Sequence, residues 1–183
     1  MCGALHSILD KVVTVTNLQT EKEDNITDLI ELLLKARLQK LKYDMAVQGR
    51  SGVSEDGRYC GEPDLRISFQ TYNIVIESVR FTKSSYDILK KHIKKIFGYD
   101  SSRKYLFDLI YFQEKNDVFL KRWDSIKKKI LGVDYPKGYP VVRSEDISQN
   151  YQNSSIKVFK VIHENGLVFY HIMANLCYVD KNA

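Results

Sequence analysis

The spacing of apolar residues predicts one long helix near the start of the chain. Apolar residues recur at three- and four-residue intervals over about 21–42, as they do on the buried face of a helix. Thr20, followed three residues later by Glu23, is typical of a capping box at the helix start. Segment 6–19 is patterned more weakly and is compatible with a short helix or a lead-in strand.

The middle of the chain predicts alternating strands and helices. A glycine-rich polar stretch at 47–63 predicts a loop with tight turns. β-Branched and aromatic runs predict strands, and the lysine-rich segments with apolar stripes predict helices. The expected elements are strands at about 64–70 and 73–80, a helix at about 84–97, a strand at 105–113 and a helix at about 116–131.

The C-terminal part predicts a loop at 133–140 and a hairpin at 155–176, because Asn165-Gly166 favours the tight turn of a β-hairpin. The order of elements predicts an α/β domain with a mixed central sheet flanked by helices. We divide the chain into an α/β core at 1–135 and an extension at 136–183, whose hairpin packs on the same domain.

Composition narrows the class of protein. A chain of 183 residues with 44% apolar residues suits one domain with a real core, and the net charge of +5 favours an anionic partner. Three scattered cysteines argue against a zinc site or a disulfide framework and indicate a reducing compartment, the cytoplasm. No apolar run is long enough to span a membrane. Sequence motifs for a nucleophilic serine or a phosphate-binding loop are also missing.

Two acidic residues of the predicted strand pair suggest a metal site. If the turn centres near 71–72, Asp64 lies opposite Val79 and diagonal to Glu77 on one face of the sheet. Two carboxylates without thiols or clustered imidazoles favour a hard cation, Mg²⁺ or Mn²⁺. The same register sets Arg66 opposite Glu77, so the alternative is an ion pair across the hairpin, with Asp64 capping a turn.

A third carboxylate comes from the first predicted helix. At 100° per residue, Glu23 falls on the apolar face, so its side chain points toward the edge of the core. Glu23 is therefore a candidate metal ligand. The alternative is that it serves only as the capping-box partner of Thr20, and the sequence leaves both open.

The predicted helix at 84–97 is strongly basic. Its apolar stripe turns most of the lysines outward, where they could follow a phosphate backbone. The alternative is an ordinary solvated helix face. The candidate nucleic-acid-binding residues are Arg80, Lys90, Lys91, Lys94 and Lys95.

These features resemble the PD-(D/E)XK, or restriction-endonuclease-like, nuclease superfamily over residues 20–131. The matching parts are the acidic helix start, the GEPD and IVIE motifs at 61–64 and 74–77, and the helix and strand that follow. More narrowly, the string from Gln48 to HIKKIFGYD is similar to nuclease-type domains attached to bacterial antiviral defence proteins.

The resemblance implies a restriction-endonuclease-like mixed sheet with the hairpin added, and phosphodiester hydrolysis with DNA favoured over RNA. It implies that Mg²⁺ or Mn²⁺ is held by Asp64, Glu77 and Glu23. It also implies an effector domain that works beside other domains or subunits and that forms a homodimer.

The sequence departs from the family pattern at one position. The family's lysine stands two residues after the glutamate, where this chain has Val79, and Arg80 points to the other face. In some members the lysine comes from another element, which makes other residues candidates for this role. Those candidates are Lys83, Lys91, Lys94 and, from the glycine-rich loop, Gln48. The alternative function is a catalytically inactive module of the same fold that binds nucleic acid or protein.

Overall fold

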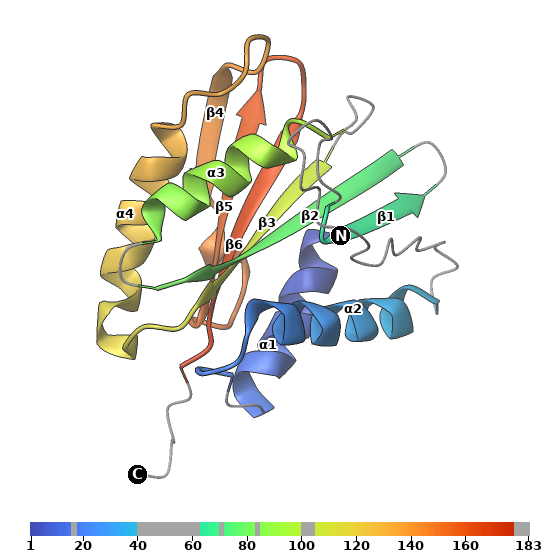
Figure 1. Ribbon diagram of the computed structural model, residues 1–183, viewed down its shortest axis with the longest axis vertical. Coiled ribbons are helices and arrows are strands. Elements are labelled where there is room, and N and C mark those ends of the chain that lie inside the picture. The colour runs from blue at the N-terminus through green and yellow to red at the C-terminus, as the bar shows by residue number, and fades with distance from the viewer. Residues whose placement is uncertain (16–17, 40–62, 70–71, 83–84, 100–104, 178–183) are drawn as a thin grey trace, which may run out of the picture.

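A six-stranded mixed sheet forms the centre of the protein (Figure 1). The computed structural model describes residues 1–15, 18–39, 63–69, 72–82, 85–99 and 105–177. The strands are β1 (Leu65–Phe69), β2 (Tyr72–Phe81), β3 (Tyr105–Phe112), β4 (Val141–Asp146), β5 (Ile156–His163) and β6 (Val168–Asn175). Their order across the sheet is β1-β2-β3-β6-β5-β4. The pairs β2–β3 and β3–β6 are parallel, and the others are antiparallel.

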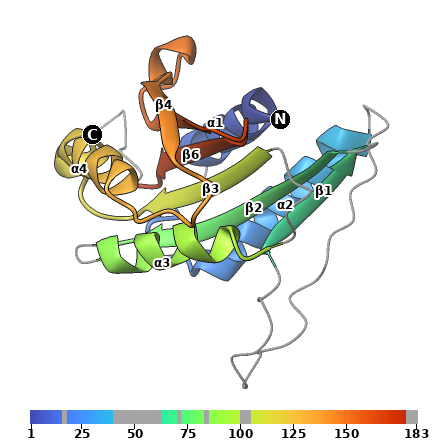
Figure 2. The ribbon, with the colours of Figure 1, turned by 90° about the horizontal axis from the view of Figure 1, so that it is seen from above.

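Helices cover both faces of this sheet. The helices are α1 (Cys2–Val15), α2 (Glu23–Gln39), α3 (Tyr86–Ile96) and α4 (Phe119–Leu131), with short 3₁₀ turns η1 (Asn116–Val118) and η2 (Ser148–Asn150). One apolar cluster joins α1 and α2 to the sheet, and a second joins α3 and α4 to the opposite face. Figure 2 shows α1 and α3 on opposite sides of β3 and β6. The α/β class with a mixed sheet flanked by helices is therefore confirmed.

Strand β2 shows how the sequence places side chains on the two faces. Ile74 and Ile76 pack in the cluster under α1 and α2, whereas Val75 and Val79 pack in the cluster under α3 and α4. Because successive strand residues alternate faces, Glu77 lies on the α3 side. The sequence alone predicted that Glu77 shares its face with Val75 and Val79.

The C-terminal hairpin forms where the Asn165-Gly166 pair predicts it. Gly166 has a φ of +80°, a left-handed conformation that glycine adopts without steric cost. Strand β6 then lies between β3 and β5, so the hairpin extends the sheet that starts in the preceding core segment. Strand β4 was not predicted, because its sequence VVRSED lies at the sheet edge and is largely exposed.

Several predicted boundaries need correction. Segment 6–19, left open between helix and strand, belongs largely to α1. The capping box at Thr20 is wrong, because α2 begins at Glu23 itself. The predicted helix end at 40–42 lies outside the described residues, as do Gln48, most of the glycine-rich loop and Lys83. None of the described helices is long and apolar enough to cross a membrane.

Candidate functional site

The pairing of β1 with β2 differs from the expected register. Leu65 pairs with Ile76 and Phe69 with Tyr72, so the turn centres between residues 70 and 71. A shift of one position in the turn centre moves every partner by two residues and keeps the faces unchanged. The expected pairing of Asp64 with Val79 is therefore wrong. One position beyond the Leu65–Ile76 pair, the same register brings Asp64 level with Glu77.

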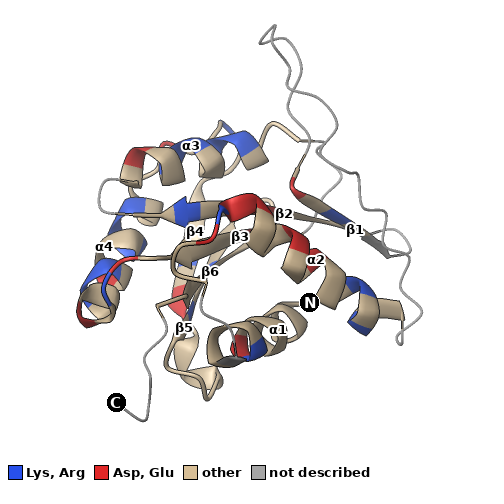
Figure 3. Ribbon diagram, turned by 60° about the horizontal axis from the view of Figure 1, so that its bottom comes forward, with Lys and Arg blue, Asp and Glu red and all other residues tan. Residues whose placement is uncertain are grey.

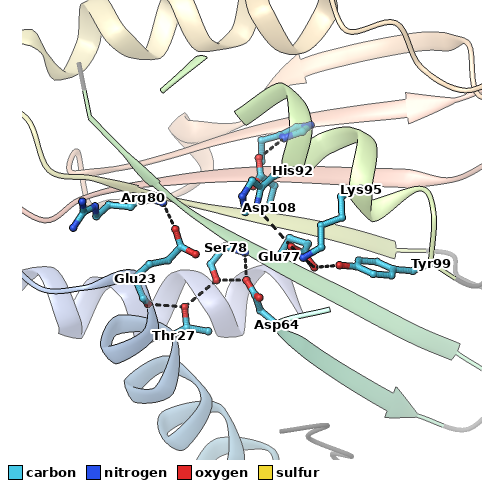
Figure 4. A network of polar contacts seen from close by, with 11 residues as sticks. Glu23, Thr27, Asp64, Glu77, Ser78, Arg80, His92, Lys95, Tyr99 and Asp108 are labelled. Carbon is cyan, nitrogen blue, oxygen red and sulfur yellow. Dashed lines mark hydrogen bonds and ion pairs between the residues drawn. The ribbon is translucent and has the colours of Figure 1, made fainter. Parts of the chain in front are cut away.

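Glu77 is buried and is held by side chains from α3 and the segment after it (Figure 4). Lys95 Nζ lies 3.0 Å from Oε2 and 3.3 Å from Oε1 of Glu77. The Tyr99 hydroxyl donates a hydrogen bond to Oε1, and His92 Nδ1 lies 3.6 Å from Oε2. The alternative ion pair between Arg66 and Glu77 is wrong, because Arg66 pairs with Val75.

These contacts set the charge of Glu77. Burial by itself would raise the pKa of this carboxyl, but the contacts with His92 and Tyr99 and the charge of Lys95 outweigh it. The pKa of Glu77 is therefore lowered, and the group is ionised at neutral pH. In return, the Glu77 carboxylate raises the pKa of His92, against the effect of burial.

Two further buried ionisable residues continue the row from Glu77 across the sheet. Asp108 of β3 pairs in register with Glu77, and His171 of β6 pairs with Asp108. His171 Nδ1 lies 3.1 Å from Asp108 Oδ2, and both side chains are almost completely buried. Sequence analysis missed this row. The signal was Asp108, the single charged residue inside the apolar run YLFDLIYF. Asp108 lies on the same face of the sheet as Glu77.

Asp64 and Glu23 cap the open edge of β2. Strand β2 continues past the end of β1, so among the described residues no strand pairs with the N–H groups of Ser78 and Arg80 on that edge. Asp64 Oδ2 accepts hydrogen bonds from Ser78 N at 2.7 Å and Ser78 Oγ at 2.6 Å. Glu23 Oε2 accepts from Arg80 N at 2.7 Å. Two carboxylates thus replace the missing strand.

The three carboxylates influence one another electrostatically. Burial raises the pKa of Asp64, and the negative charge of Glu77 raises it further. Burial likewise raises the pKa of Glu23, with a smaller contribution from Asp64. A positive charge near Asp64 and Glu77 would relieve this repulsion.

The expected three-carboxylate metal group is not assembled in the described part of the chain. There, no three His, Cys, Asp or Glu residues gather closely enough to hold a metal ion. Glu23 is engaged at Arg80, two residues further along β2 than the Ser78 contact of Asp64. Asp64 and Glu77 remain as a pair of neighbouring carboxylates, with Lys95 beside them.

The predicted basic residues separate into different places. Lys91 is exposed on the outer side of α3, and Lys94 Nζ lies 3.8 Å from Asp134 Oδ2. Arg80 is exposed on β2, and only Lys95 reaches Glu77. Lys95 was expected to bind nucleic acid, not to join the acidic site. The usable signal was its three-residue spacing from His92, which puts both on one side of α3.

Comparisons with protein-family models, curated proteins and solved structures find no match for this chain. The geometry of the site must therefore carry the functional argument. A cavity of about 960 Å³ lies elsewhere and includes His6, Asp10 and Tyr151 in its lining, and a smaller one includes Trp123. Neither of these cavities is lined by Asp64 or Glu77. Asp64 and Glu23 lie along the edge of β2, whereas Glu77 is buried beneath α3.

Proposed function

We propose that this chain is a restriction-endonuclease-like module that hydrolyses phosphodiester bonds in nucleic acid, DNA in preference to RNA. The parts that the family resemblance implies around the acids are a strand that carries the glutamate, a following helix and a further strand. Strand β2, helix α3 and strand β3 have this order, and β2 pairs with both β1 and β3.

The contact between Lys95 and Glu77 carries the proposal. The family lysine is missing at Val79, but the Lys95 amine, from the next helix, lies 3.0 Å from the Glu77 carboxylate. A lysine beside the acidic site can orient the attacking water and stabilise the charge that develops on the phosphate. Among the described lysines of α3, Lys95 therefore takes this role in place of Lys91 and Lys94, whereas Lys83 lies outside the described residues.

The donor set fits Mg²⁺ or Mn²⁺. Such an ion binds one or two carboxylates and completes its shell with water and substrate oxygens, and Asp64 and Glu77 would supply the carboxylates. When bound, the ion would supply a Lewis acid for the phosphate and lower the pKa of an attacking water. Glu77 is kept ionised by its partners, and Ser78 fixes the orientation of Asp64. Both carboxylates would share their oxygens between the ion and these partners.

A plasmid-cleavage assay with Mg²⁺ or Mn²⁺ tests the proposal. The variant Asp64→Asn keeps an oxygen acceptor for Ser78 but removes the charge that a metal needs. Asp28→Asn is the matched control, because Asp28 is exposed on α2 and lies outside the site. We expect the parent and Asp28→Asn to cleave, and Asp64→Asn to lose cleavage. Equal cleavage by all three would refute the assignment.

A catalytically inactive module is the second candidate. It is favoured by Val79 and by the saturation of Glu77, whose oxygens already contact Lys95, Tyr99 and His92. In that case the buried carboxylate serves the fold, and the protein acts by binding nucleic acid or another protein. Duplex binding without any cleavage in Mg²⁺ or Mn²⁺ would support this candidate.

The family resemblance extends the proposal to the setting in which the module works. It suggests a homodimer in the cytoplasm and an effector role within a larger antiviral defence protein. Light scattering during size-exclusion chromatography tests the homodimer directly. A mass equal to one chain of 21.3 kDa over a range of concentrations would remove that part of the proposal.

A further inference from the structure

Helices α3 and α4 concentrate the positive charge of the chain on one face of the sheet. Helix α3 has four lysines and one acid, Asp87, and α4 has four lysines, Arg122 and one acid, Asp124. Their net charges of +3 and +4 give +7, which exceeds the +5 of the whole chain and leaves the remainder at −2. Figure 3 shows the basic residues along both helices. The positive charge of the chain is thus concentrated on the α3 and α4 side of the sheet.

Contacts between the helices show which sides face each other. Tyr86, Lys90 and Lys94 follow one another at four-residue spacing, so they form one stripe along α3. Arg122 Nη1 lies 3.5 Å from the Tyr86 hydroxyl, and Lys129 Nζ lies 5.8 Å from the centre of the Tyr86 ring. The stripe therefore faces α4, and cations of both helices gather along the line between them.

Much of this charge is available to a ligand. Lys91, Lys121 and Lys128 are exposed and Lys90 is half-buried. Within the described residues these four lysines make no ion pair, whereas Lys127 is paired with Asp124 and Asp146. The charge of Lys127 is balanced by these two carboxylates, whereas no described carboxylate balances the other four. Their field is therefore directed at the solvent.

The two exposed apolar residues of α4, Leu120 and Leu131, lie on another side of that helix. At 100° per residue, Leu120 and Leu131 fall with Lys127 on the flank away from Arg122 and Lys129. A membrane-binding helix instead places apolar side chains at the centre of its basic face. On α3, Ile88 is 48% exposed and lies three residues before Lys91, so one apolar side chain lies among the lysines. A surface that is otherwise cationic fits a polyanion with regularly spaced phosphates better than a lipid surface, which needs several apolar side chains to insert.

Along the described residues of α3 and α4, the face also has no exposed aromatic ring on which bases could stack. Its one aromatic residue, Tyr86, is half-buried, with its ring against Phe81 and its hydroxyl near Arg122. Single-stranded nucleic acids are bound largely by stacking of bases on exposed aromatic rings, whereas duplexes are held through their phosphates. The absence of such a ring on this part of the surface favours a duplex.

We propose that the α3–α4 face, whose available cations are Lys90, Lys91, Lys121 and Lys128, binds the sugar-phosphate backbone of double-stranded DNA. This inference rests on the proposed function for the class of ligand, and it adds α4 to the binding surface. The face does not include Asp64 or Glu77, so binding and cleavage can be tested separately.

Fluorescence anisotropy with a labelled duplex of about 25 base pairs, in EDTA and at several salt concentrations, tests the proposal. The test variant is Lys90→Gln/Lys128→Gln, one lysine from each helix. The matched control is Lys11→Gln/Lys22→Gln, two exposed lysines from α1 and from the segment before α2. Each lost phosphate contact lowers the slope of log K against log salt by about 1. We expect a slope lower by about 2 for the test variant and no change for the control.

Three outcomes would overturn the inference: equal slopes for the two variants, tighter binding of a single strand of the same length, or binding to anionic phosphatidylserine vesicles but not to the duplex. Circular dichroism confirms that the variants are folded. If the slopes are as expected but the plasmid is not cleaved, the binding proposal stands and only the proposed hydrolase activity is refuted. If the parent cleaves the plasmid but the slope of the test variant is unchanged, only the binding proposal is refuted.

Discussion

Lys95 Nζ of α3 lies 3.0 Å from Oε2 of Glu77 on β2, so a lysine from the next helix neutralises a buried carboxylate in the sheet. The arrangement has two consequences. It holds α3 in place over β2, and it sets a cation beside the carboxylate that the proposed hydrolase uses.

Replacement of Lys95 tests both consequences. In Lys95→Met, Glu77 loses its cation but keeps Tyr99 and His92. Because the Lys95 side chain is 41% exposed, we expect a loss of about 1–2 kcal/mol in the free energy of unfolding, less than for a fully buried pair. Cleavage should fall at least tenfold, as expected when a group that stabilises transition-state charge is removed. Urea denaturation and the plasmid assay measure the two effects. Lys11→Met, at an exposed position of α1 away from the acidic site and the basic helices, should change neither.

Two substitutions of Asp64, which caps the edge of β2, distinguish its structural role from its proposed catalytic role. Asp64→Ala leaves Ser78 N–H without its acceptor and should lower the free energy of unfolding by about 1–3 kcal/mol. Asp64→Asn keeps an acceptor and should cost clearly less, whereas both variants should lose cleavage. Thermal or urea unfolding compares the two. Equal destabilisation by both substitutions would show that the charge, and not the hydrogen bond, holds the edge.

The buried pair of Asp108 and His171 should behave as a unit. His171→Leu leaves Asp108 buried without its partner, and we expect a loss of about 3–5 kcal/mol in the free energy of unfolding. The double variant Asp108→Leu/His171→Leu should recover much of this loss, because an apolar pair needs no desolvation of charge. A double-mutant cycle in urea measures the coupling. Additive single and double effects would contradict it.

Asp146 predicts a stability change at acidic pH. Its burial would raise the pKa, but hydrogen bonds from Lys127, Ser148 and Trp123 outweigh this and lower the pKa to about 2. A lowered pKa stabilises the folded state above the unfolded-state pKa of 3.8, and this contribution is lost as pH falls toward 2. Asp146→Asn should therefore be less stable than the parent at neutral pH, and the difference should shrink from about pH 4 to pH 2.

Urea unfolding at a series of pH values measures this difference. Glu145→Gln is the control, because Glu145 is more exposed and contacts only the exposed Arg143 among the described ion pairs. A difference between the parent and Asp146→Asn that stays constant down to pH 2 would contradict the prediction.

Local patterns in the sequence predict most of the helices and strands. The apolar spacing that places Leu89 and Ile93 on one side of α3 is set by the helical repeat, and the alternation along β2 assigns Glu77 to its face before any neighbour is known. Asn165-Gly166 specifies its own turn. Strand β4 escaped prediction because an exposed edge strand needs no apolar alternation.

The acidic site was predicted in part. The sequence brought Asp64 and Glu77 into one hairpin, and the structure agrees that they are neighbours near its open end. The register was misjudged, because the turn between the strands carries no strong turn signal and a shift of one position in its centre leaves the pattern of faces unchanged. Lys95 was counted as a surface lysine, because helical spacing alone does not say which strand lies beneath it.

The sequence by itself determined most of the elements, the direction in which each side chain leaves its own element, and the excess of positive charge on α3 and α4. Only the tertiary structure decided that Lys95 covers Glu77, that Asp64 and Glu23 close the edge of β2, and that Asp108 and His171 extend the buried row. The physical reason is that local periodicity fixes orientation within one helix or strand. Which residues meet across elements depends on strand register and helix packing, which arise from contacts distant in the chain.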